Sequence, residues 1–169
     1  MSHTSQYSFG LSTIKIGDIL GDGGMGTTLN VLGQTAEDTC ELVNDDPETT
    51  EFYVEESDDP VVQISKAGKS TLKLTVADPD IETLQTLFGG TTIGETPNRV
   101  WHYPATIPTI EKSIEVTPAN GFTKFNFPRC SMTAKFNSKF SKKTLFQIEV
   151  TALLLTPTKA GLTKMYVNE

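Results

Sequence analysis

One stretch of the chain, residues 70–90 with the sequence STLKLTVADPDIETLQTLFGG, joins a strand pattern directly to a helix pattern. Leu72, Leu74 and Val76 alternate with polar residues, which is the period of a half-buried strand. An apolar stripe at helical spacing follows, formed by Ile81, Leu84, Leu87 and Phe88. A helix of about ten residues is only marginally stable by itself. We therefore expect this stripe to pack on a β core.

Both ends of the expected helix carry residues that suit helix termini. Asp78 is predicted to be the N-cap, and Pro79 the first helical residue, where its missing N–H costs no hydrogen bond. Gly89 and Gly90 are expected to end the helix, because glycine adopts the left-handed conformation at little cost. The pattern thus predicts a helix over residues 79–88 that covers an open end of a β core.

The rest of the 169-residue chain is typical of antiparallel β structure. Its 25 threonines suit sheet faces that meet water or other protein. Arg129–Asn137 alternates apolar and polar residues, and Asn120-Gly121 is a strong β-hairpin signal. We predict a mainly β fold, a β-sandwich or half-barrel of antiparallel strands flanked by one short helix. It is expected to form a single domain, residues 1–169, with long loops and a flexible N-terminal arm at residues 1–11.

The segment Thr144–Leu154 alternates over its whole length, with Phe146 and Ile148 at its inward positions. Eleven residues would form a strand of about 36 Å, about twice the usual length. A sheet that continues into neighbouring copies would explain such a strand, because pairing across the boundary removes the exposed edge.

Charge is distributed unevenly along the chain. Residues 1–100 carry 17 acidic and 5 basic side chains, whereas residues 101–169 carry 4 acidic and 9 basic ones. This asymmetry can solvate two separate faces, or it can let one copy meet the next through opposite charges. Within the strongly acidic residues 37–60, Thr50–Glu55 is predicted as a strand and Ser57–Pro60 as a turn. The acidic segment is either a solvated loop or a surface that avoids polyanions.

The sequence patterns that could carry catalysis or binding are incomplete. The glycines of Gly21–Gly26 match a dinucleotide-binding spacing, and Ala67–Ser70 resembles the end of a P-loop, but neither precedes an expected helix. The acidic segment lacks the EF-hand order of ligands. His102 has no second histidine nearby, and Cys40 and Cys130 are far apart. We predict no catalytic, cofactor-binding or metal-binding residues.

Targeting signals are also missing from the pattern. The first residues lack the basic and apolar regions of a signal peptide, and the longest aliphatic run, Ala152–Leu155, is too short for a membrane span. With two cysteines and no disulfide framework, the expectation is reduced thiols and synthesis in a cytoplasm.

The order of these segments resembles that of a known family. An N-terminal YSFGLSTIKIG is followed by a glycine-rich turn, an acidic segment ending EFYVEESDDP, the unit ADPDIETLQTLFGG and a more basic, strand-rich part. This layout, which covers nearly the whole chain, is similar to that of the major tail tube proteins of long-tailed bacteriophages. Those proteins resemble in fold the tube-forming secreted protein of type VI secretion systems.

The resemblance implies a structural virion protein rather than an enzyme. It would be assembled in the host cytoplasm into hexameric rings that stack into the tail tube, with a tail terminator, a tape measure protein and a baseplate as further partners. DNA would pass through without specific binding, and no membrane would be involved. We expect stacking through the N-terminal arm, Gly21–Gly26 and Glu37–Asp46. The predicted acidic pore or stacking surface consists of Glu37, Asp38, Glu41, Asp45, Asp46, Glu51, Glu55, Glu56, Asp58 and Asp59.

Two other classes of protein stay open at this point. A tail terminator or a head-decoration protein is also β-rich, and it forms rings or trimers without polymerising. A small carbohydrate-binding β-sandwich would need an exposed aromatic platform, whereas this chain has one tryptophan, close to prolines.

Overall fold

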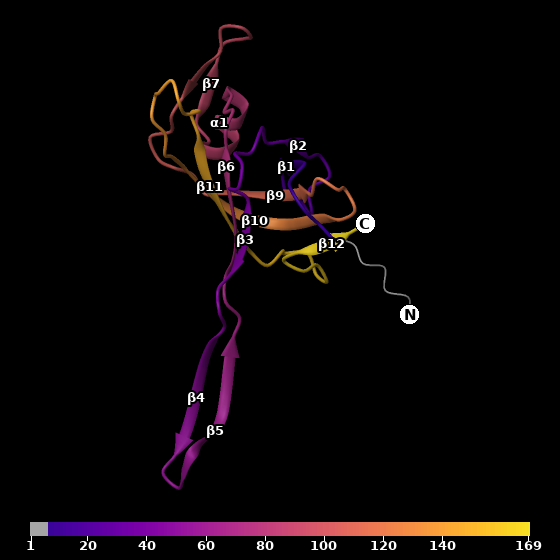
Figure 1. The fold of residues 1–169 in the computed structure, drawn as a ribbon, viewed down its shortest axis with the longest axis vertical. Helices are drawn as coiled ribbons and strands as arrows, with labels where there is room; N and C mark the ends of the chain where they lie inside the picture. Colours follow the sequence, from indigo (N-terminus) through magenta and orange to yellow (C-terminus); the bar gives the residue numbers. More distant parts are fainter. Residues whose placement is uncertain (1–6) are drawn as a thin grey trace.

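Strands with one apolar and one polar face build an antiparallel sheet, and a separate two-stranded hairpin projects far from it (Figure 1). The computed structural model describes residues 7–169. The sheet has eight strands in the order β2-β1-β9-β10-β11-β6-β3, and β12 pairs with β10. These strands are β1 (Thr13–Gly17), β2 (Asn30–Val31), β3 (Glu41–Asn44), β6 (Ser70–Val76), β9 (Ile110–Thr117), β10 (Lys124–Phe136), β11 (Ile148–Leu154) and β12 (Tyr166–Asn168).

The register of the sheet places the apolar residues of neighbouring strands in rows on one face. Met132 lies opposite Ala152, which lies opposite Leu72, and all three side chains are buried. The next rows continue the same core with Val150 and Leu74. Because alternate residues of a strand point to opposite faces, this one register fixes the whole core.

The opposite face of the sheet is polar, and its charges are paired between strands. The distances are 2.8 Å for Lys135–Glu149, 2.9 Å for Arg129–Glu111, 3.6 Å for Lys73–Glu41 and 3.9 Å for Lys15–Glu115. Threonines fill part of the space between them, and Thr133 lies opposite Thr151. The face is therefore hydrophilic with balanced charge.

Residues 32–36 connect one edge of the sheet to the other. The Leu32 N–H donates to the Ile14 carbonyl at 2.9 Å, and the Ala36 N–H donates to the Thr75 carbonyl at 2.8 Å. The sheet is thereby curved into a half-barrel around its apolar face. The predicted mainly β fold of antiparallel strands with one short helix is confirmed.

The helix α1 spans Ile81–Phe88, so the predicted start at residue 79 is wrong. Asp80, not Asp78, is the N-cap, and its carboxylate accepts from the Thr83 N–H at 2.7 Å. The carboxylate of Asp78 instead accepts from the Gln34 N–H. The helix ends at Gly89, which has a φ of 74°, as the glycine pair predicts.

The helix is held by aromatic packing between its last residue and two other segments, β10 and a small hairpin. Phe88 is buried and stacks on Phe136 with ring centroids 4.5 Å apart. The small hairpin consists of β7 (Thr91–Ile93) and β8 (Val100–His102). The ring centroid of Trp101 in β8 lies 6.1 Å from that of Phe88. Its indole N–H donates to the Gly89 carbonyl at 2.9 Å. The helix end, the small hairpin and β10 therefore form one packed unit.

The projecting hairpin consists of β4 (Glu48–Val54) and β5 (Ser57–Lys66) (Figure 1). The predicted strand at Thr50–Glu55 corresponds to β4, but the predicted turn at Ser57–Pro60 is wrong, because the chain turns at Glu55-Glu56. At about 3.3 Å per residue, the ten residues of β5 extend about 33 Å.

The predicted strand at Thr144–Leu154 is confirmed from Ile148 onward, but its predicted start and length are wrong, since β11 spans only Ile148–Leu154. Its partners end there, because Ile148 lies opposite Phe136, the last residue of β10, and opposite Val76, the last residue of β6. The longest strand is instead the 13-residue β10.

The expected N-terminal arm is only partly described, because residues 1–6 lie outside the described residues. Residues 7–11 are held along the β9–β10 connection. The Ala119 N–H donates to the Phe9 carbonyl at 3.1 Å, and the Ser8 hydroxyl lies 2.8 Å from that of Thr123. This part of the arm is therefore attached to the body.

Candidate assembly surface

The β4–β5 hairpin has one apolar and one polar face, set by its register. Phe52 lies opposite Val62 and Thr50 opposite Ile64, so these side chains share a face. Glu51, opposite Gln63, lies on the other face. The hairpin thus has the same two-faced pattern as the strands of the body.

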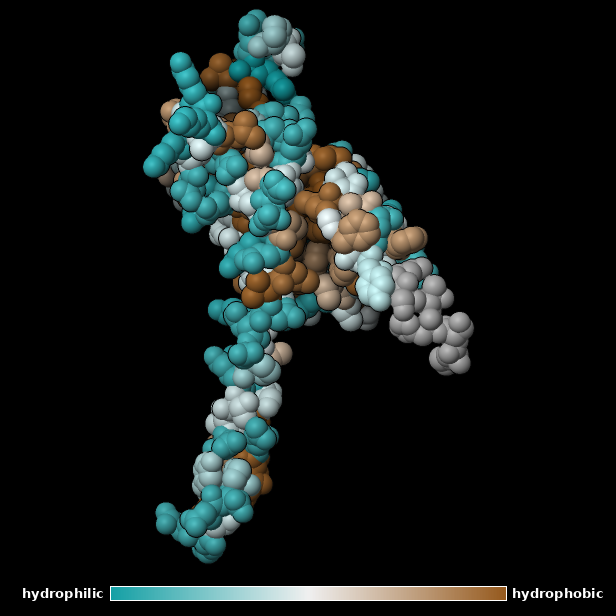
Figure 2. Space-filling view, viewed as in Figure 1, coloured by the Kyte–Doolittle hydropathy of each residue, from teal (hydrophilic) through white to brown (hydrophobic). Residues whose placement is uncertain are grey.

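Unlike the body, the hairpin leaves its apolar face in solvent. Phe52 is 49%, Val62 50% and Ile64 56% exposed. In Figure 2, hydrophobic surface lies on one side of the outer part of the projecting hairpin, and hydrophilic surface covers the other side and the tip. A two-stranded hairpin is marginally stable in water without a packed face. Contiguous exposed apolar surface of this kind marks an interaction site.

The predicted acidic surface is divided by the fold into a group on the hairpin and several separate residues. Glu51, Glu55, Glu56, Asp58 and Asp59 lie on the hairpin, where Glu48 joins them. Of the remaining predicted residues, Asp45 and Asp46 lie at its base, Glu41 pairs with Lys73 on the sheet, and Glu37 and Asp38 border a groove in the body.

Few contacts restrain the side chains of the hairpin. The Tyr53 hydroxyl donates to Glu51 Oε2 at 2.6 Å, and this hydrogen bond raises the pKa of Tyr53. None of the seven ion pairs within residues 7–169 includes a carboxylate of the hairpin. These carboxylates are therefore available to cations from outside the molecule.

A second exposed surface lies on the β10–β11 loop, residues 137–147. It contains Lys139, Lys142 and Lys143 and no acidic residue, and all three lysines are exposed. Phe140 is 93% exposed, although it stacks on Phe146 at a centroid distance of 5.2 Å. The loop is ordered by internal bonds, among them one from the Ser138 hydroxyl to the Leu145 carbonyl at 3.2 Å. This surface was not predicted from the sequence, although the run KFSKK at residues 139–143 combines basic and aromatic residues.

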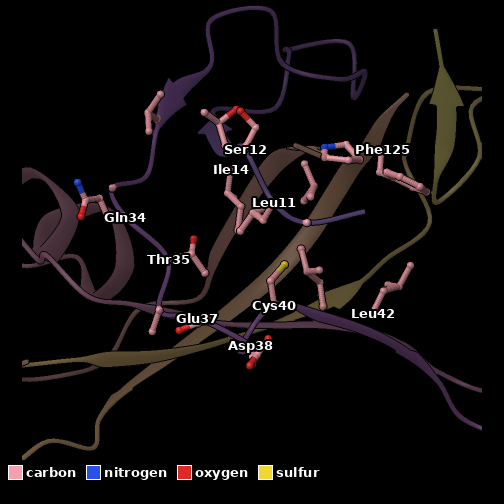
Figure 3. Close-up of a pocket in the computed structure, with 18 of the residues that line it drawn as sticks. Leu11, Ser12, Ile14, Gln34, Thr35, Glu37, Asp38, Cys40, Leu42 and Phe125 are labelled. Atoms are coloured by element: carbon pink, nitrogen blue, oxygen red, sulfur yellow. The ribbon is translucent and has the colours of Figure 1, made fainter. Parts of the chain in front are cut away.

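The body contains a groove of about 1120 Å³ between the two edges of the half-barrel. Figure 3 shows Leu11 and Ile14 on one side of it and Cys40 and Leu42 on the other. Burial raises the pKa of the Cys40 thiol. The described lining contains no histidine, lysine or arginine, so no positively charged side chain of the groove stabilises the thiolate of Cys40.

The glycine-rich turn Gly21–Gly26, which we expect to contribute to stacking, is fastened to the body. Asp22 pairs with Lys159 at 2.8 Å, and the Gly26 N–H donates to the Ser113 hydroxyl at 2.9 Å. The hydrogen bond from Lys159 lowers the pKa of Asp22. This turn is thus a fixed part of the surface.

The residues predicted to pack the helix contribute unequally. Leu87 and Phe88 are buried, Leu84 is partly buried against the core, and Ile81 is partly exposed and lies outside it. Thr83 is buried instead, and its hydroxyl donates to the Leu32 carbonyl at 3.2 Å. A short polar side chain fits there because its hydroxyl provides a hydrogen-bond donor for a carbonyl of residues 32–36, the segment that connects the two sheet edges.

Within residues 7–169, no three or more His, Cys, Asp or Glu side chains are grouped so that they could hold a metal ion. No helix in this range is long and apolar enough to span a membrane. No family model matches the chain, and no curated protein matches it.

Proposed function

We propose that this chain is the subunit of a bacteriophage tail tube, which assembles into hexameric rings that stack around a channel for DNA. In this role it meets copies of itself along the tube, and a tail terminator, a tape measure protein and a baseplate at the ends or inside. It is a structural protein of the virion tail, and it is not an enzyme.

The observation that carries the proposal is the β4–β5 hairpin. It extends about 33 Å from the body, and its apolar side chains, such as Phe52 and Ile64, stay about half exposed. A monomer gains little from such an element, because the exposed strands add unpaired edges without a core. In a repeating assembly, the same element buries its apolar face on another copy.

The edges of the main sheet support assembly in the same way. The edge strand β3 exposes Leu42 and Val43, and β2 at the other edge has only two residues. An exposed edge strand is a template for pairing with another chain. Rings in which the sheets of adjacent subunits meet would cover these edges.

The polar face of the sheet is suited to a channel wall. Its lysines and Arg129 are paired with glutamates on neighbouring strands, so few free cations remain on it to hold phosphate groups. In our proposal this charge-balanced face forms part of the pore wall, acidic residues outnumber basic ones over the pore as a whole, and DNA therefore slides without binding. A reconstruction in which Lys124, Lys135, Lys139, Lys142 and Lys143 are the main pore lining would contradict this part.

Electron microscopy of the purified full-length chain over a range of concentrations tests the proposal. We expect six-fold rings and, at higher concentration, tubes of constant diameter whose length increases. Rings that never elongate would favour a tail terminator, and trimers a head-decoration protein. Dispersed monomers at all concentrations would contradict every one of these assemblies.

A further inference from the structure

We propose that the acidic β4–β5 hairpin of one copy docks on the basic β10–β11 loop of another copy, and that this contact joins copies head to tail. The inference rests on the proposed function, because it names the two surfaces that meet when rings stack. It is argued from the position, the polarity and the charge of the two elements.

The two elements lie at opposite ends of the same strands, so they cannot meet within one molecule. The hairpin leaves the sheet where Asn44 pairs with Ser70, at the start of β6. The β10–β11 loop leaves it where Phe136 and Ile148 meet Val76, at the end of β6 (Figure 1). A contact between different surfaces on two copies either closes into a ring or propagates as an open stack, and because these two surfaces lie at opposite ends of β6 we expect it to propagate.

Their charges are complementary. From Glu48 to Lys66 the hairpin carries six acidic residues and one basic residue, whereas the loop carries three basic residues and no acidic one. None of these lysines takes part in the ion pairs of residues 7–169, and neither do the hairpin carboxylates. Because the hairpin carboxylates and the loop lysines are both without an ion-pair partner in the described chain, their attraction can set which surfaces of two copies meet and in which orientation.

Both elements also offer apolar side chains between their charges. The hairpin presents Phe52, Val62 and Ile64, and the loop presents Phe140 and Leu145, which is 67% exposed. Phe140 rests on Phe146, which in turn lies 5.8 Å from Phe136, so it is backed by an aromatic stack that reaches the core. A rigid aromatic anchor within a charged rim is the usual anatomy of a protein interface.

The loop could also attract nucleic acid, because lysines beside an exposed aromatic ring suit phosphates and bases. We favour the hairpin as its occupant for two reasons on the same chain. The hairpin has an apolar face that needs cover, and its excess of carboxylates matches the lysines of the loop.

Charge reversal in matched pairs tests the contact. Lys142→Glu with Lys143→Glu reverses the loop, and Glu55→Lys with Glu56→Lys reverses the tip of the hairpin. Lys124→Glu with Lys164→Glu is the control, because both residues are exposed lysines outside any described ion pair and Lys124 lies at the far end of β10. Sedimentation and electron microscopy at about 0.05 M salt measure the concentration needed for association.

We expect each reversal to raise that concentration at least about tenfold, and the control to change it little. A chain that carries both reversals should associate nearly as well as the wild type, because opposite charges face each other again. If the wild type forms tubes and the loop reversal behaves like the control, this contact is wrong while the proposed function stands. If the wild type never associates, both are wrong.

A gel-shift assay with double-stranded DNA identifies the other occupant. If the loop reversal abolishes DNA binding and leaves tube assembly unchanged, the loop is a nucleic-acid site and the docking proposal is overturned. Equal DNA binding by the loop reversal and the control, together with lost assembly, supports docking.

Discussion

The hairpin and the body use the same strand pattern with opposite results. In the body, Leu74 lies opposite Val150, and these side chains are 2% and 1% exposed. In the hairpin, Phe52 lies opposite Val62 at 49% and 50% exposure. Both pairs follow a period of two, so alternation alone does not distinguish a core made by one chain from a face that another chain covers.

The difference lies in what packs above the apolar face. In the body, the sheet curves over itself, and α1 with its Phe88 closes the space. Within residues 7–169 no further strand or helix packs on the apolar face of the hairpin, and its two strands are held mainly by the hydrogen bonds between them. The body is therefore expected to carry the stability of the monomer, and the hairpin its association.

Replacing one phenylalanine in each region should give the largest difference in the free energy of unfolding between body and hairpin. Phe88→Ala deletes a buried ring from the aromatic cluster and should lower the free energy of unfolding by about 3–5 kcal/mol. Phe52→Ala should lower it by less than about 0.5 kcal/mol and should weaken assembly instead. Urea unfolding of the dilute protein measures both variants. Equal losses would show that the hairpin packs on the body.

Replacing one aspartate in each region should give the next largest difference in the free energy of unfolding. Asp80→Ala removes the N-cap of α1 and should cost about 1 kcal/mol, whereas Asp59→Ala on the hairpin should cost almost nothing. The hydrogen bond from the Thr83 N–H lowers the pKa of Asp80 below its ordinary 3.8. The cap therefore contributes fully above the pKa of the unfolded chain, and its contribution is lost as the pH falls through the lower folded pKa.

Unfolding curves between neutral and strongly acidic pH check this sign. The difference in stability between the wild type and Asp80→Ala should be constant above about pH 5 and should shrink below about pH 4. A difference that grows with acid would mean that the carboxylate is not the capping group.

Replacing a basic residue in each region should give a smaller difference in the free energy of unfolding than the two comparisons above. Arg129 donates from Nε to Glu111 Oε2 at 2.9 Å and from Nη2 to Oε1 at 3.0 Å, and it also reaches the Thr156 carbonyl at 3.1 Å. Arg129→Met should cost about 0.5–1 kcal/mol, and the cost should shrink in high salt. Lys66 lies opposite Glu48 without forming an ion pair, so Lys66→Met should leave monomer stability nearly unchanged. A similar loss of stability in both variants, measured by thermal unfolding, would contradict the expectation that only the ion pair of the body contributes to the stability of the monomer.

Sequence patterns predicted the unit of β6 and α1 well because its signals are local. Leu72, Leu74 and Val76 alternate, and Gly89 ends the helix as expected. The cap was misplaced because two aspartates, two residues apart, both suit an N-cap. Which aspartate caps the helix depends on Gln34, whose backbone N–H donates a hydrogen bond to the Asp78 carboxylate. No local sequence pattern reveals that contact.

The hairpin and the β10–β11 loop were harder to predict for physical reasons. Pro60 suggests a turn, but it is tolerated in β5 beside a register shift, on a strand that has only one partner. Thr144–Gln147 alternates like a strand, but no partner extends beyond Phe136 or Val76 to pair with it. The position of the two charged surfaces at opposite ends of β6 depends on tertiary pairing, which the sequence does not display.

Removal of the hairpin should change the stability of the body least of all. Replacing residues 47–67 with Asn-Gly keeps Asn44 opposite Ser70 and retains the bond from the Asp45 N–H to the Lys69 carbonyl at 2.8 Å. A two-residue Asn-Gly loop fits an antiparallel pair, so β3 and β6 can stay joined.

We expect the shortened chain to unfold within about 0.5 kcal/mol of the wild type and to remain monomeric at concentrations at which the wild type forms tubes. Urea unfolding and sedimentation measure the two quantities on the same sample. Tubes of normal diameter from the shortened chain would show that the sheet edges alone drive assembly. A large loss of stability would instead assign the exposed apolar face of the hairpin to the fold of its own chain.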